Sequence, residues 1–153
     1  MKSVSKVLVT GASGFIGSNL TRNLIKTEDE VNVLVRKKSN LWRINDVLSE
    51  CNVHTVDLSD FEEVRNLISK VKPKIVYHCA TYGVYPNQKD VSKMDQTNVI
   101  GTSNLLTSLH ENSELERLVN LGSVVEYGPK SNSIKETEPV QPFNSYSVTK
   151  VSQ

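Results

Sequence analysis

The chain has 153 residues, which is enough for one domain with one hydrophobic core. Its formal net charge is only +1 and the charged residues are scattered, so we expect no nucleic-acid-binding surface. No apolar run approaches the roughly 20 residues of a membrane span, and the N-terminal residues lack the apolar segment of an export signal, so we expect a soluble, cytoplasmic protein without a membrane partner.

Short β-branched runs alternate with amphipathic segments along the whole chain. Helices are expected at residues 14–26 and 41–49, after a cap at Ser59 or Asp60, at 91–112, and from about residue 144. Strands are expected at residues 6–10, 31–36, 53–57, 75–79 and 118–123. This alternation predicts an α/β fold, a Rossmann-like doubly wound parallel sheet in the order 3-2-1-4-5. Ligands of such sheets bind at the carboxyl ends of the strands.

A glycine-rich turn follows the first strand, with Gly11, Gly14 and Gly17 spaced three residues apart. Backbone amides in such a turn, together with the start of a helix, favour a pyrophosphate. Gly11 would permit the turn, Gly14 would let phosphate approach, and Gly17 would let the helix pack closely on the sheet. The alternative is a set of glycines that serves the turn only. The candidate dinucleotide-binding residues here are Gly11, Ser13, Gly14, Phe15, Ile16 and Gly17.

Residues at the ends of the next two strands bear on which dinucleotide binds. The second strand ends with Arg36, where many dinucleotide-binding folds have an acid that holds the ribose. Arginine binds phosphate oxygens, so we favour NADP over NAD; alternatively, Arg36 only ends a strand. Asp57 could accept a hydrogen bond from the adenine amino group or cap a helix, and Leu58 would line the adenine pocket.

Three residues form a candidate catalytic set. Tyr146 and Lys150 lie four residues apart at the start of a helix, which places them on one face. An ammonium next to a phenol favours its ionised form, which makes the phenol a better base. Ser123, at the expected end of the fifth strand, could bond to a substrate oxygen. Cys51 and Cys79 have no metal-ligand spacing, so we expect reduced thiols and no metal site.

Six segments in this order cover almost the whole chain. They are TGASGFIG at 10–17, DL at 57–58, HCA at 78–80, NVIGT at 98–102, GSVVEYG at 122–128 and YSVTK at 146–150. Together they resemble the extended short-chain dehydrogenase/reductase family, and within it the NAD(P)-dependent sugar-nucleotide epimerases and dehydratases. The stretch VRKKSNLWRI at 35–44 is similar to members that take NADP. Val124 and Thr81 depart from the usual family residues, which leaves the substrate details open.

The resemblance implies a role for each matching residue. Tyr146 would be the general acid/base, Lys150 would hold the nicotinamide ribose, and Ser123 would orient the substrate oxygen. Asn98 would support this geometry, while Ala80 and Thr81 would line the cofactor channel. The implied chemistry begins with hydride transfer from a nucleotide sugar to the nicotinamide, after which epimerases, dehydratases and reductases diverge.

The resemblance also implies further strands and a C-terminal substrate domain. Residues 1–153 would then be an incomplete dinucleotide-binding domain, a poor catalyst by itself, and possible homodimer contacts would lie on the helix at 91–112 and on the Tyr–Lys helix. The alternative is a truncated dinucleotide-binding module without chemistry. His78, within the fourth strand, is expected to be packed rather than catalytic.

Overall fold

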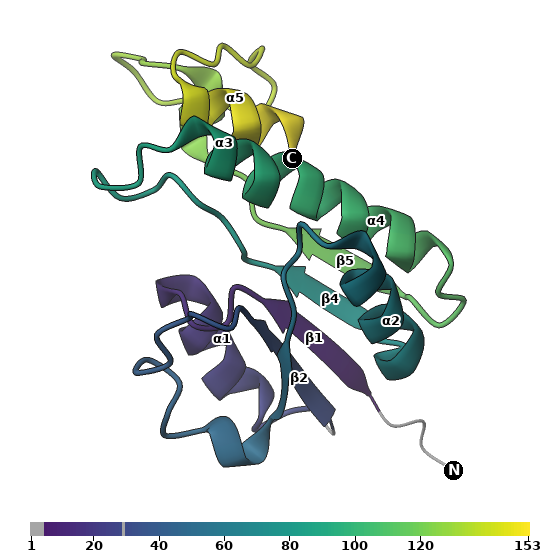
Figure 1. Cartoon of the computed structure of the whole chain (residues 1–153). Helices are drawn as coiled ribbons and strands as arrows, with labels where there is room; N and C mark the ends of the chain where they lie inside the picture. Colours follow the sequence, from purple (N-terminus) through teal and green to yellow (C-terminus); the bar gives the residue numbers. More distant parts are fainter. Residues whose placement is uncertain (1–4, 29) are drawn as a thin grey trace.

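We describe the protein from a computed structural model that covers residues 5–28 and 30–153 (Figure 1). Residues 1–4, part of the segment in which we expect no export signal, lie outside the described residues, as does residue 29. The strands of the described part form one parallel sheet in the order β3-β2-β1-β4-β5, which confirms the predicted order. They are β1 (Lys6–Thr10), β2 (Glu30–Val35), β3 (Asn52–Thr55), β4 (Ile75–His78) and β5 (Arg117–Asn120).

Four of the strands end one to three residues earlier than predicted. Arg36, Asp57 and Ser123 were expected to end strands, and each instead lies just beyond one. The reason is that each begins a turn: its carbonyl oxygen accepts a hydrogen bond from the amide three residues later, at 2.9, 3.0 and 3.1 Å respectively. These turns lead the chain away from the sheet at the edge where we expect ligand to bind.

The helices connect the strands in the expected places, with one exception. They are α1 (Phe15–Leu24), α2 (Phe61–Val71), α3 (Val91–Met94), the π-helical segment η2 (Asp95–Ile100), α4 (Gly101–His110) and α5 (Ser145–Ser152). The helix predicted at residues 91–112 is therefore observed as three consecutive segments, α3, η2 and α4. Asp60, and not Ser59, caps α2, because its carboxylate accepts from the Glu63 amide at 3.0 Å.

The helix predicted at residues 41–49 is wrong. This segment is a series of turns followed by the 3₁₀ helix η1 (Leu48–Glu50). The Ile44 amide donates to the Leu41 carbonyl and the Val47 amide to that of Ile44, so the bonds span three residues and not four. Ile44 and Val47 are both buried, and their spacing of three residues in the sequence resembles that of an amphipathic helix.

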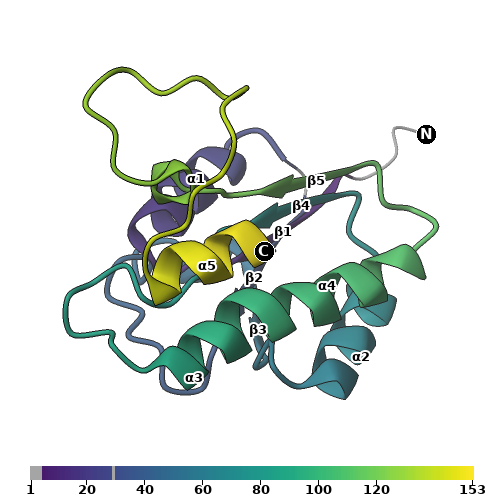
Figure 2. The same ribbon diagram turned by 90° about the horizontal axis from the view of Figure 1, so that it is seen from above.

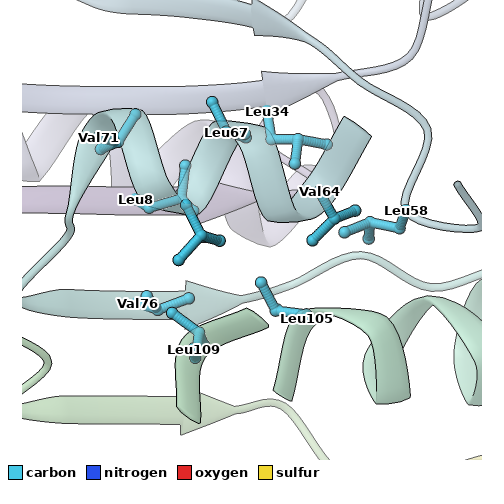
Figure 3. Close-up of a cluster of buried hydrophobic side chains, with 10 residues drawn as sticks. Leu8, Leu34, Leu58, Val64, Leu67, Val71, Val76, Leu105 and Leu109 are labelled. Carbon is cyan, nitrogen blue, oxygen red and sulfur yellow. The ribbon is translucent and has the colours of Figure 1, made fainter. Parts of the chain in front are cut away.

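Two apolar cores lie on opposite faces of the sheet. Alternate side chains of β1 point to opposite faces: Leu8 joins one cluster, and Val7 and Val9 join the other. The Leu8 cluster, drawn in Figure 3, is covered by α2 and α4, and the Val7 cluster by α1 and the turns before η1 (Figure 2). The helix α5 lies beside α3 and η2 (Figure 1).

None of the helices in the described part of the chain combines the length and apolar composition that crossing a membrane requires.

Candidate functional site

Close backbone contacts exclude side chains at two of the three glycines in and after the turn between β1 and α1. Gly11 has a φ of +65°, and a Cβ there would lie 2.6 Å from the backbone nitrogen of Ala80. A Cβ at Gly17 would lie 2.9 Å from the Cα of Ala12, and closer still to the carbonyl oxygen of Gly11. The tight contact of Gly17 is therefore made with the turn itself. At Gly14 the same atom would meet only the Gly11 oxygen, at 3.1 Å.

The start of α1 is open to an anion. Gly14 is the N-cap residue and supplies no side-chain cap, and the first turn of this fully described helix contains no acidic residue. Phe15 and Ile16 are 69% and 56% exposed although they are large and apolar, while Ser13 is half-buried. A narrow backbone turn, free helix amides and flanking apolar surface fit the pyrophosphate of a dinucleotide.

Arg36 lies beyond β2 with its side chain exposed. Its backbone amide donates to the Ser39 hydroxyl at 3.0 Å, which fixes the start of the following turn. Further along this segment, the Arg43 guanidinium lies 4.3 Å from the ring centre of the exposed Trp42. Arg36 is thus an exposed residue just beyond the carboxyl end of β2, the edge of the sheet at which ligands of such folds bind.

Asp57 and Leu58 are placed differently from one another. One carboxylate oxygen of Asp57 accepts from the Ser59 amide at 3.0 Å and from the Ser59 hydroxyl at 2.8 Å, so this residue shapes the turn before α2. Its exposure leaves the other oxygen open to a ligand. Leu58 is buried in the core cluster shown in Figure 3, and its carbonyl accepts from Asn104 at 2.9 Å.

Asn98 is fully buried in η2 and joins two chain segments of the site. Its Oδ1 accepts from the Tyr82 amide at 2.8 Å and from the Thr81 hydroxyl at 3.2 Å. Its Nδ2 donates to the Tyr82 carbonyl and to the Thr149 hydroxyl, each at 2.9 Å. Asn98 therefore ties the loop that follows β4 to α5.

Tyr146 and Lys150 lie on α5, which begins at the cap residue Asn144. The Tyr146 ring packs against the loop after β4, since a Cβ at Gly83 would lie 2.9 Å from Cδ2 of Tyr146. The Lys150 ammonium is buried and donates to the Leu121 carbonyl at 2.6 Å and to the Gln153 side chain. Burial lowers the pKa of Lys150, while the Glu126 carboxylate acts in the opposite direction.

Ser123 lies at the start of the 3₁₀ helix η3 (Val124–Tyr127), and not within β5 as predicted. Its amide donates to Glu126 Oε1 at 2.6 Å. The helix α5, which carries Tyr146 and Lys150, packs against η3, and Ser123 is the residue that precedes η3. Two residues of the site were not predicted from the sequence: Gly83, which contacts Tyr146, and Thr149, which contacts Asn98. In the sequence, Gly83 is marked only as a glycine within a polar loop. In the structure its φ is +106°, a backbone conformation that favours glycine.

The cysteines and histidines add no metal site. Cys51 and Cys79 are both free, and burial raises the pKa of Cys79 to about 11, which makes its thiol unreactive. Over residues 5–28 and 30–153, no three His, Cys, Asp or Glu side chains are placed to hold a metal ion. His78 is 1% exposed, in agreement with the packed position expected for it.

Acidification is expected to destabilise the protein through His78. Burial, and to a smaller extent the charge of Lys150, lowers its pKa from 6.5 to about 4. The neutral ring therefore contributes its full stability above about pH 6.5, and that contribution is lost as the pH falls toward 4. The free energy of unfolding, measured by urea titration between pH 6.5 and 4, tests this. The measurement is made on the His54→Gln variant, because His54 also has a lowered pKa and would add to the effect. A constant unfolding free energy would contradict it.

Comparison with known proteins shows which family and which proteins this chain resembles. The model of the NAD dependent epimerase/dehydratase family matches residues 7–153. A UDP-glucose 4-epimerase of Lactobacillus helveticus is 32% identical over 95% of this chain, and a dTDP-D-glucose 4,6-dehydratase of Dictyostelium discoideum is 30% identical over 96%. The chain spans 44% and 38% of these relatives. The structure of Bordetella bronchiseptica WbmG in complex with NAD has a TM-score of 0.87 and 24% identity, with 99% of this chain and 48% of that one aligned.

Proposed function

Because the chain belongs to the NAD dependent epimerase/dehydratase family, we propose that it is the dinucleotide-binding part of an enzyme that transforms a nucleotide sugar by hydride transfer. The observation that carries this proposal is the β1–α1 turn. Gly11 in this turn and Gly17 in α1 leave no room for a Cβ, and the turn opens onto the uncapped start of α1. A turn that served only to connect two elements would not need this uncapped helix end.

Ser123, Tyr146 and Lys150 are proposed to carry the proton chemistry. The ionised Tyr146 oxygen would take the proton from a sugar hydroxyl as hydride leaves the same carbon, and would return it in the reverse step. The buried ammonium of Lys150 would stabilise the ionised phenol. The Ser123 hydroxyl would orient the reacting sugar oxygen. Bound dinucleotide would supply the hydride acceptor, and the backbone of Gly11 and Gly14, at the start of α1, would hold its pyrophosphate.

The substrate class we propose is a nucleoside diphosphate hexose. The two relatives described above are named for UDP-glucose and dTDP-D-glucose. Incubation with each of these sugars and a dinucleotide tests the proposal through the absorbance of reduced nicotinamide and the formation of a new sugar. The expected result is conversion of at least one nucleotide sugar by the protein that contains this chain. Binding of dinucleotide without conversion of any nucleoside diphosphate hexose would contradict it.

We propose NADP as the preferred dinucleotide. At this position a carboxylate would bind the ribose hydroxyls and repel a 2′-phosphate, whereas the exposed Arg36 can bind the phosphate. Arg36→Asp is expected to weaken NADP binding by about 1.5–3 kcal/mol, the value of a hydrogen bond to a charged group, and to leave NAD binding unchanged or improved. Calorimetric titration of both proteins with both dinucleotides measures this. Lys38→Asp changes the net charge of the protein by the same amount, two residues away from Arg36, and serves as the control. Tighter binding of NAD than of NADP by the unmodified protein would contradict the preference.

The proposed partners and location follow from the surface and the thiols. Large apolar side chains remain exposed on the long helix, at Ile100 and Leu106, and on α5, at Val148 and Val151. We propose that they form a homodimer contact, which sedimentation would detect. The free thiols support a reducing compartment such as the cytoplasm.

A second candidate is a binding module without turnover. The relatives are more than twice as long as the part of them that this chain matches. We therefore expect residues 1–153 by themselves to bind the adenosine half of a dinucleotide and to turn over little nucleotide sugar. Rapid turnover by this segment alone would exclude the second candidate.

A further inference from the structure

A row of buried polar side chains crosses the core between the glycine turn and the long helix. Thr10 is the last residue of β1, His78 is the last residue of β4, and Thr102 lies on α4. The Thr10 hydroxyl is 2.6 Å from Nδ1 of His78, and the Thr102 hydroxyl is 2.9 Å from Nε2. All three residues are buried, so water does not replace these bonds.

The hydrogen bonds of the two threonines determine where the ring carries its proton. Thr102 donates to the Asn98 carbonyl at 2.7 Å, which leaves its oxygen to accept from His78, so we assign the hydrogen of the ring to Nε2. The depressed pKa of the ring keeps it neutral, so Nδ1 is bare and accepts from the Thr10 hydroxyl. Thr10 in turn accepts from the Ala80 amide at 3.2 Å. This arrangement gives every donor in the row one acceptor.

The row continues to the helix that carries the candidate catalytic residues. Thr102 ends on the backbone of Asn98, whose side chain donates to Thr149 at 2.9 Å. The Thr149 hydroxyl donates to the Tyr146 carbonyl, also at 2.9 Å. A continuous chain of residues therefore links the end of β1, next to Gly11, with Tyr146 on α5.

We propose that His78 is a positioning residue, whose neutral Nε2–H ring fixes the glycine turn at a set distance from α5. This inference rests on the proposed function, because a dinucleotide would have to reach from the turn to Lys150. Buried polar rows with all groups satisfied hold one arrangement, since every shift leaves a donor or acceptor without a partner. A ring that merely fills space would not depend on either hydroxyl.

The first test removes a hydroxyl far from the glycine turn. Thr102→Val keeps the shape of the side chain and is expected to weaken NAD or NADP binding by about 2- to 30-fold, the range of coupling through connected residues. Thr102→Ser keeps the hydroxyl and is expected to bind as the unmodified protein does. Ser108→Ala is the matched control, because Ser108 is buried on the same helix and bonds only to the Asn104 carbonyl in its own helix. Equal affinities for Thr102→Val and Ser108→Ala would overturn the proposal.

The second test uses the fact that Thr10 and Thr102 meet through His78. In a double-mutant cycle, Thr10→Val and Thr102→Val are expected to be non-additive in unfolding free energy, and the non-additivity is expected to disappear when His78 is replaced by phenylalanine. Additive effects in the unmodified background would overturn the proposal. This cycle needs no ligand, so it decides the proposal even if the protein binds neither dinucleotide and the proposed function fails.

The third test needs no variant and applies even where the valine variants fail to fold. Nitrogen NMR of the His78 ring distinguishes the protonated nitrogen from the bare one. The expected spectrum shows hydrogen on Nε2 alone at pH 6.5, the value at which an ordinary histidine is half protonated. Hydrogen on Nδ1 alone, or on both nitrogens, would overturn the proposal.

Discussion

Replacing Tyr146 by phenylalanine is expected to lower turnover of a nucleotide sugar by about 10²- to 10⁴-fold, the range typical for loss of a general acid/base. The ring would remain packed against Gly83, because only the hydroxyl is removed. Dinucleotide affinity and stability are therefore expected to change little. Steady-state kinetics of the protein that contains this chain, together with a dinucleotide titration, separate the two effects.

The matched control for this variant is Tyr77→Phe, which removes a hydroxyl from the middle of β4 and not from α5. Its turnover is expected to equal that of the unmodified protein. If Tyr146→Phe retains full turnover, the proposed proton transfer by Tyr146 is wrong. If both variants lose turnover equally, a general structural effect explains the loss.

Gly17→Ala is expected to destabilise the protein by roughly 3 kcal/mol or more, at the upper end of the range for overpacking. The added methyl group would overlap backbone atoms of Gly11 and Ala12, which cannot rotate away as a side chain can. Either the start of α1 moves away from the turn or the turn itself opens. The free energy of unfolding from urea titration measures the loss.

Gly14→Ala is the control for this second prediction. A Cβ at Gly14 would meet only the Gly11 oxygen at 3.1 Å, and the backbone at this residue has an ordinary φ of −77°. Its cost is expected to be about 1 kcal/mol or less, comparable to an exposed N-cap change. Equal stabilities of Gly14→Ala and Gly17→Ala would show that the turn is looser than the structure indicates.

The strand order and the glycine turn could be predicted because local signals determine them. The buried β-branched runs specify strands, and the right-handed crossover rule limits their order. A glycine spacing between a strand and a helix indicates the turn, and the structure adds only which atoms make each glycine necessary. For Gly17, for example, the nearest atoms belong to the backbone of the turn.

The remaining features depend on tertiary contacts that no local pattern records. Ile44 and Val47 have helical spacing, yet their segment forms successive turns that pack on α1, where Arg22 bonds to Asp46 at 2.7 Å. Ser123 lies past β5 because its carbonyl begins a turn. Asn98 was predicted to support the site, but its partner Thr149 is 51 residues away and becomes visible only in the folded chain.

The most direct test of the central claim, that the β1–α1 turn binds a dinucleotide, is a calorimetric titration of the unmodified protein and of Gly14→Ala with NAD and NADP. The methyl group of Gly14→Ala leaves the fold intact but occupies the space through which phosphate reaches the backbone. We expect saturable binding of at least one dinucleotide to the unmodified protein and greatly weakened binding to the variant. Absence of binding to the unmodified protein, or equal affinity for both proteins, would contradict the assignment of this turn.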